Sequence, residues 1–198
     1  IVIFASSGFI HAFKPDGTEA AGFPVALPRR PAMEPTNTKN VAGSCGYRES
    51  KAGCVAQNGG VDPDVARMTD MMPGSIGDLD GDGTLEVVVT TWDGYVFAFE
   101  HDGTLRTGWP KTMNFDNAKD NDEDRVMEPG FFASPVLYDL DQQPGLEIIA
   151  AGMDQHIYVW HADGSVMAPY PKRLFNPGDT QSVETRARIV STPAVGDI

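Results

Sequence analysis

The sequence has 198 residues, enough to bury a substantial core in one or two domains. No apolar run approaches the roughly 18 residues of a membrane-spanning helix, so membrane insertion is not expected. Lys and Arg number 15 against 28 Asp and Glu, and the net charge of −13 argues against nucleic acid as a partner. This acidic balance suits a protein that binds cations, although solubility alone also accounts for it.

The N-terminal stretch, residues 1–27, carries a pattern that returns later in the chain. The run from Phe9 to Phe13 is followed by an Asp16-Gly17 turn and by Gly22-Phe23-Pro24. The chain begins at Ile1 without Met, so we expect an internal piece of a longer protein. A missing signal peptide then says nothing about export.

Residues 28–69 form the longer of two insertions and contain both cysteines. Cys45 and Cys54 lie nine residues apart in a Gly/Ser-rich stretch. A disulfide closing this small loop would fit an oxidising compartment, whereas two free thiols would fit a reducing one. Two Cys without a nearby His make a poor zinc site. We favour the disulfide, because the two cysteines stand alone in one loop of a chain that we expect to be exported.

The most informative stretch runs from Asp78 to Glu86. Its opening, D-x-D-x-D-G, puts Asp78, Asp80 and Asp82 at alternate positions, where their carboxylates can converge on one hard cation. An EF-hand would place a Glu at position twelve, but that position is Val89, inside a β-branched run that predicts a strand. We therefore predict a calcium loop within a β-hairpin. The alternative is a metal-free Asp/Gly turn, in which the three carboxylates would repel one another.

The residues after this loop predict an antiparallel sheet. The strand at Val87–Thr91 leads through the hairpin pair Asp93-Gly94 into an alternating strand at Val96–Phe99. A second Asp-Gly turn and a last strand ending in Gly-Trp-Pro complete four strands. Residues 114–130 then form a second, acidic insertion that we interpret as a solvated loop. Long loops on a rigid scaffold often carry binding, so both insertions are candidates for partner contact.

Internal repetition determines the predicted fold. Asp78, Asp139 and Asp197 open similar segments spaced 61 and 58 residues apart. The pattern defines repeats at about 1–27, 70–113 and 131–174 and the start of another at 189–198. Four-stranded antiparallel units in series are the blades of a propeller. We therefore predict an all-β chain that forms a β-propeller segment.

The acidic loop, the Asp-Gly hairpins and Gly108-Trp109-Pro110 together resemble the FG-GAP/VCBS repeat, the blade of integrin α-subunit propellers. The resemblance covers nearly the whole chain apart from the two insertions. It implies a calcium-stabilised propeller. The metal ligands that it implies are the side chains of Asp78, Asp80, Asp82 and Glu86 and the carbonyl of Thr84.

The loop of the next repeat departs from this pattern. Asp139, Asp141 and Glu147 keep the acidic positions, but Gln143 stands where the first loop has Asp82. Gln142 and Pro144 replace the two glycines. We therefore expect the second loop to bind calcium weakly or not at all.

The sequence contains no H-E-x-x-H, G-x-S-x-G or phosphate-binding glycine motif. The expected function is a non-catalytic module for adhesion, recognition or scaffolding, in an extracellular, cell-surface or periplasmic protein. Expected partners are a protein or carbohydrate ligand at the loops, and further blades or another chain at the open ends. Two alternatives stay open: part of a propeller enzyme resembling polysaccharide lyases or quinoprotein dehydrogenases, and a structural subunit of a larger assembly.

Overall fold

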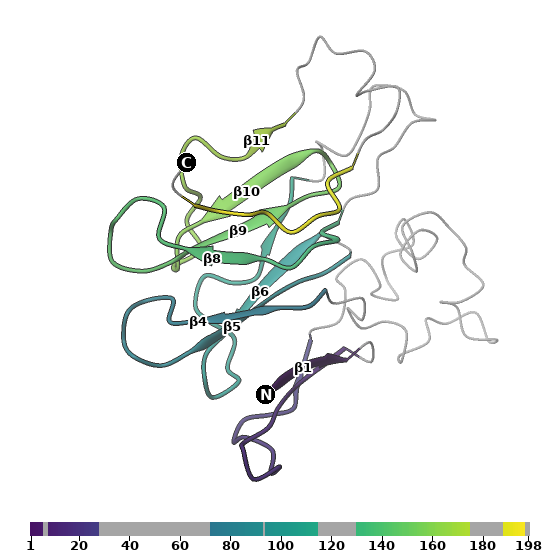
Figure 1. Ribbon diagram of the computed structural model, residues 1–198, viewed down its shortest axis with the longest axis vertical. Helices are drawn as coiled ribbons and strands as arrows, with labels where there is room; N and C mark the ends of the chain where they lie inside the picture. Colours follow the sequence, from purple (N-terminus) through teal and green to yellow (C-terminus); the bar gives the residue numbers. More distant parts are fainter. Residues whose placement is uncertain (6–7, 28–71, 93, 115–129, 175–187, 197–198) are drawn as a thin grey trace, which may run out of the picture. The chain divides into compact units, whose positions relative to one another are not determined.

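The computed structural model describes residues 1–5, 8–27, 72–92, 94–114, 130–174 and 188–196. These residues form three antiparallel sheets and contain no helix, so the all-β prediction is confirmed for them (Figure 1). No helix in this part of the chain is long and apolar enough to cross a membrane. The chain divides into two compact units, Ile1–Met71 and Met72–Ile198.

The first unit contains a three-stranded sheet in the order β1-β2-β3. Its strands are β1 (Val2–Ala5), β2 (Phe9–Ala12) and β3 (Val25–Ala26). In the turn after β2, Thr18 donates both its N–H and its hydroxyl to Asp16. Gly17 takes the positive φ of 83° that the turn requires.

The second unit contains two four-stranded sheets, ordered β4-β5-β6-β7 and β8-β9-β10-β11. The strands of the first are β4 (Ser75–Gly77), β5 (Glu86–Thr90), β6 (Tyr95–Phe99) and β7 (Lys111–Thr112). Those of the second are β8 (Val136–Tyr138), β9 (Glu147–Ala151), β10 (His156–Trp160) and β11 (Lys172–Arg173).

The two four-stranded sheets share one register. Val88 pairs with Ser75 and Ala98, and Ile149, which lies 61 residues later, pairs with Val136 and Val159. Both partners of Ile149 also lie 61 residues after those of Val88. The sheet of the first unit follows the same pairing with an offset of 86, because Val2 pairs with Ala12. The predicted hairpin between β5 and β6 is confirmed.

The two sheets of the second unit pack face to face around one buried cluster. The β4–β7 sheet contributes one face, made by Val88, Val96 and Ala98. The β8–β11 sheet contributes Ile148, Ala150, Tyr158 and Trp160. The counterparts of these four residues, 61 positions earlier, are Val87, Val89, Phe97 and Phe99 on the opposite face of the β4–β7 sheet. The sheets therefore meet through non-equivalent faces.

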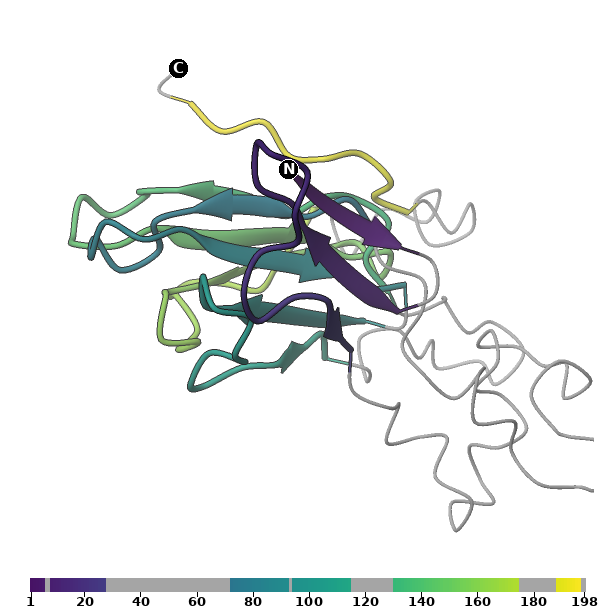
Figure 2. The same cartoon turned by 90° about the horizontal axis from the view of Figure 1, so that it is seen from below.

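Hydrogen bonds at several places along the interface join the same two sheets. The Thr90 hydroxyl donates to the Ala133 carbonyl at 2.8 Å, and the Trp109 indole N–H donates to the Ala162 carbonyl at 3.1 Å. The loops after β4 and β8 lie side by side at one edge, where the Leu146 N–H donates to the Leu79 carbonyl at 3.0 Å (Figure 1 and Figure 2).

Gly108 lies where the outer turns of the two sheets come close to each other. Its φ is 89°, and a Cβ added there would lie 2.2 Å from the Asp163 carbonyl oxygen. Gly81 has a similar φ of 80°, but nothing lies within 4 Å of a Cβ there. Both positions favour glycine, but only Gly108 also lacks space for a side chain.

We expect Gly81→Ala to cost about 1–2 kcal/mol of unfolding free energy, the strain of a left-handed alanine. Gly108→Ala should cost clearly more, because backbone atoms must also separate. Chemical denaturation in the presence of a chelator, which removes any effect on metal binding, measures both. Equal losses for the two variants would show that the sheets do not meet at this turn.

Candidate metal centres in the acidic loops

Two groups of three potential metal ligands occur in the described part of the chain. The first is Asp78, Asp80 and Glu86, around the loop between β4 and β5 (the first acidic loop). The second is Asp141, Glu147 and His161, around the loop between β8 and β9 (the second acidic loop). Within each group, the ligand atoms all lie within 4.8 Å of one another.

The backbone of the first acidic loop wraps around Asp78. The N–H groups of Gly81, Asp82 and Gly83 donate to its carboxylate oxygens at 2.8, 3.1 and 3.0 Å. Gly81 and Gly83 both have positive φ, which lets successive N–H groups turn inward. Asp78 is thus held in place from within the loop.

Glu86 begins β5 and is fully buried. Its Oε2 accepts the Leu79 N–H at 2.7 Å, which fixes the carboxylate beneath the loop. Burial raises the pKa of Glu86 above its usual value, and the charge of Asp80 raises it further. A bound cation would reverse both effects, because it favours the ionised carboxylate.

Asp82 lies outside this group of three. Its Oδ1 accepts both the N–H and the hydroxyl of Thr84 at 2.7 Å, and these bonds lower the pKa of Asp82. The predicted participation of Asp82 and of the Thr84 carbonyl in metal binding stays a prediction.

Arg106 is a neighbour of the first acidic loop that the sequence analysis missed. Its Nη2 lies 2.8 Å from Asp80 Oδ2, its Nη1 lies 3.1 Å from both Glu100 oxygens, and its Nε donates to the Ala162 carbonyl at 3.1 Å. Burial lowers the pKa of Arg106, but the bond to Asp80 and the charges of Glu100 and Asp80 outweigh it and raise the pKa overall. Arg106 supplies positive charge to the carboxylates that a metal would bind.

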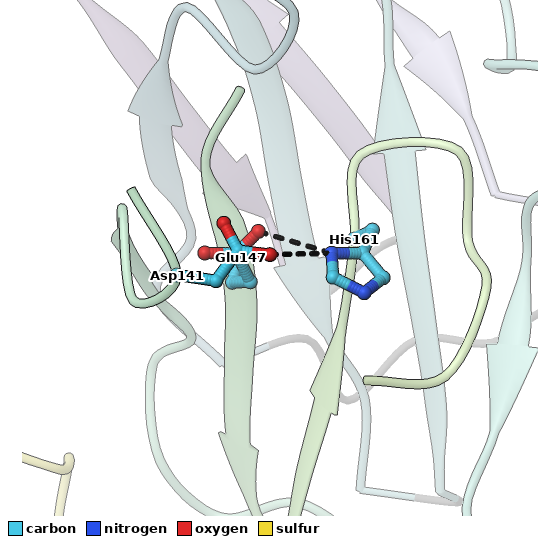
Figure 3. Close-up of side chains that lie close together, drawn as sticks. All are labelled: Asp141, Glu147 and His161. Atoms are coloured by element: carbon cyan, nitrogen blue, oxygen red, sulfur yellow. Dashed lines mark hydrogen bonds and ion pairs between the residues drawn. The ribbon is translucent and has the colours of Figure 1, made fainter. Parts of the chain in front are cut away.

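The second acidic loop gathers a different set of side chains (Figure 3). Glu147 repeats the arrangement of Glu86, because its Oε2 accepts the Leu140 N–H at 2.7 Å. Asp141 and Glu147 are predicted site residues, but the third member is His161, which the sequence analysis did not propose. The predicted residues Asp139 and Gln143 lie outside the group.

The backbone of the second acidic loop keeps a tight turn without the first loop's glycines. Asp139 Oδ1 accepts the Gln142 N–H at 2.7 Å, and Gln142 takes a left-handed φ of 60° at the position of Gly81. Proline at 144 is unable to adopt positive φ, and Gly145 takes a φ of 110° instead. The replaced glycines therefore change the turn without removing it.

A further buried carboxylate, Asp154, lies in the hairpin between β9 and β10. Its Oδ2 accepts the Tyr158 hydroxyl at 2.6 Å and lies 3.2 Å from His156 Nδ1. Burial lowers the pKa of His156, but the hydrogen bond and charge of Asp154 outweigh it, so the pKa is raised. This arrangement secures a buried charge in the core and contacts neither acidic loop's ligand group.

A pocket of about 500 Å³ opens between β7 and β10. Tyr158 and Trp160 line it, but they are only 4% and 3% exposed. Rings buried to this extent offer little face for stacking against a ligand.

The predicted disulfide between Cys45 and Cys54 lies outside the described residues, as do nearly all of the two insertions. No protein-family model matches the chain, and no curated protein is significantly similar to it.

Arg106→Gln should lower the unfolding free energy of the metal-free protein by about 1–3 kcal/mol, since it removes two partly exposed ion pairs and a bond to Ala162. The stabilisation by calcium should be larger than in the wild type, because the ion then compensates carboxylates that have lost their arginine. Thermal melts with calcium and with chelator measure both terms.

Arg173→Gln is the matched control, because Arg173 bonds to the Gln155 side chain, away from both loops. It should lower the melting temperature equally with and without calcium. If calcium raises the melting temperature of Arg106→Gln by no more than it raises that of the wild type, Arg106 and calcium do not compensate the same carboxylates.

His156 predicts a pH dependence of stability. Because its folded pKa is raised above the ordinary value of 6.5, protonated His156 stabilises the fold. This contribution is complete below pH 6.5 and is lost as the pH rises through the folded pKa. His156→Gln should remove that slope, which urea denaturation at several pH values would measure. His101→Gln, at an exposed position, should retain the slope; equal slopes for wild type and His156→Gln would refute the assignment.

Proposed function

We propose that this chain is part of a calcium-stabilised β-propeller of the FG-GAP/VCBS type. Its role would be a non-catalytic recognition or scaffold module in an exported protein. The observation that carries the proposal is the combination of repeated sheets with one register and an acidic loop between their first two strands.

The head-to-tail packing of the β4–β7 and β8–β11 sheets supports a propeller. Each sheet is buried on both faces along one of its central strands, because β5 and β9 are buried at every position. Sheets that meet through non-equivalent faces can repeat the same interface indefinitely, and they form a ring when the rotation closes. A closed ring of four-stranded sheets is a propeller.

Calcium would have a structural role here. The ion takes six to eight oxygen ligands, and Asp78, Asp80 and Glu86 bring three carboxylates to one place. It would compensate the negative charge of the buried Glu86 carboxylate. It would also fix the loop whose Leu79 carbonyl accepts a hydrogen bond from Leu146 in the next repeat. Metal binding in one repeat would thereby stabilise the packing of two.

Recognition would belong to the insertions at 28–69 and 114–130, which separate the last strand of one repeat from the first strand of the next. Loops of this length on a rigid sheet scaffold commonly carry binding residues. Export is supported by the resemblance to secreted propellers and by the predicted pairing of Cys45 with Cys54. A protein or carbohydrate ligand is the expected partner.

Calcium should raise the melting temperature relative to chelator. At a hundredfold excess over the dissociation constant, the stabilisation is about 2.7 kcal/mol, or roughly 5–11 °C for a protein of this size. Asp80→Asn should abolish the difference. Asp102→Asn is the control, because it removes the same charge from an exposed turn outside the ligand group, where Asp102 accepts the N–H and the hydroxyl of Thr104.

If chelation leaves the melting curve of the folded protein unchanged, the first acidic loop is only a turn, and the calcium part of the proposal is wrong. A glycan-binding screen and assays for polysaccharide cleavage address the module's role. Turnover of any substrate would replace the recognition module by a propeller enzyme.

A further inference from the structure

The second acidic loop has lost the donors that calcium prefers. Asp139 is not one of the three gathered ligands, and Gln143 brings no charge. Two carboxylates remain, Asp141 and Glu147. This is a poor set for an ion that takes six to eight oxygens.

A nitrogen donor completes the set instead. His161 Nδ1 lies 3.1 Å from Glu147 Oε1 and 3.9 Å from Asp141 Oδ2, and the three side chains point toward one another (Figure 3). Ligands about 2.0–2.2 Å from a tetrahedral zinc ion are about 3.3–3.6 Å apart, so these separations already approach those of a metal site. We propose that Asp141, Glu147 and His161 bind one Zn²⁺ or a similar divalent transition-metal ion, with a position left for water.

The protein orients this set before any ion binds. Glu147 is 4% exposed, and its Oε2 is occupied by the Leu140 N–H, which leaves Oε1 directed at His161. Asp141 Oδ1 accepts the Gln143 N–H at 2.9 Å, which leaves Oδ2 on the side of His161. Such supporting bonds hold metal ligands in place.

Comparison of the two repeats strengthens the assignment, because the changes come as a pair. His161 replaces Glu100, and Met167 replaces Arg106, each at an offset of 61 residues. Glu100 and Arg106 form an ion pair beside the first acidic loop, and Arg106 supplies positive charge to Asp80 in that loop. Beside the second acidic loop, the position of the arginine carries the neutral thioether of Met167, and the position of Glu100 carries the imidazole of His161, which can bind a metal. Imidazole with carboxylate suits zinc and its neighbours, whereas oxygen alone suits calcium.

The test is a titration of the chelator-treated, dialysed protein with zinc chloride, followed by calorimetry. We expect one site that depends on His161, with His161→Gln weakening binding by at least about 100-fold. Glutamine keeps a hydrogen-bond donor for Glu147 but is a poor zinc ligand. Co²⁺ in place of zinc should give visible d–d absorption that His161→Gln removes.

Two further variants make the test independent of folding defects. Met167→Arg keeps all three ligands and restores the cation of the first loop, so it should also weaken zinc binding. His101→Gln, at an exposed position outside the group, should leave binding unchanged. Zinc binding that is absent in the wild type, or equal in wild type and His161→Gln, would overturn the proposal.

The proposal does not depend on calcium in the first acidic loop, and the two sites are separable by experiment. Asp80→Asn should remove the calcium effect on melting and leave zinc binding intact. Millimolar calcium should not displace zinc from the wild type. Displacement would identify the second acidic loop as a calcium loop and would overturn the zinc assignment.

Discussion

A buried glutamate at the start of the second strand is the constraint around which each four-stranded sheet is arranged. Glu86 and Glu147 are 0% and 4% exposed, and a carboxylate so placed must be compensated. In both sheets, a backbone N–H from the loop above supplies the first compensation, from Leu79 or Leu140. The loop conformation follows, because the chain must fold back over the glutamate to make that bond.

The remaining compensation differs between the two repeats and determines what each loop can bind. Near Glu86, two further carboxylates, Asp78 and Asp80, gather beside it, and Arg106 supplies positive charge through its ion pair with Asp80. Near Glu147, His161 donates directly to the buried carboxylate. One backbone arrangement therefore supports an all-oxygen cluster with a guanidinium at its rim in one repeat, and a mixed nitrogen and oxygen cluster in the next.

Much of the fold was predictable from sequence because its determinants are local. Asp-Gly turns, a β-branched run and side chains that alternate between faces fix the hairpin at β5 and β6 and its register. The 61-residue offset then predicted the same hairpin at β9 and β10. The choice of which face meets the neighbouring sheet was not predictable in this way, because Val88 and Val87 are both apolar and both buried.

The candidate sites were predictable only in part, for the same physical reason. Asp78, Asp80 and Glu86 lie within nine consecutive residues. The spacing of the aspartates indicated that Asp78 and Asp80 converge, and the resemblance to the FG-GAP/VCBS repeat implied that Glu86 joins them. Arg106 reaches Asp80 across 26 residues and His161 reaches Glu147 across 14, contacts that exist only once the strand register is known. Asp82 was proposed as a ligand because alternate acids can converge on one cation. Its role stays a prediction, and the bonds that it accepts from Thr84 were not read from the spacing.

The paired replacement of Glu100 by His161 and of Arg106 by Met167 follows from charge balance. Replacing the arginine alone would leave Glu100 and Asp80 without their shared cation. Replacing the glutamate alone would bring an imidazole beside a guanidinium, which disfavours protonation of the ring and competes for the same carboxylate. Only the joint exchange leaves a satisfied cluster, with the imidazole hydrogen-bonded to the buried glutamate. Because the surrounding strands have the same register in both repeats, such a change in ligand chemistry requires no change in the sheet.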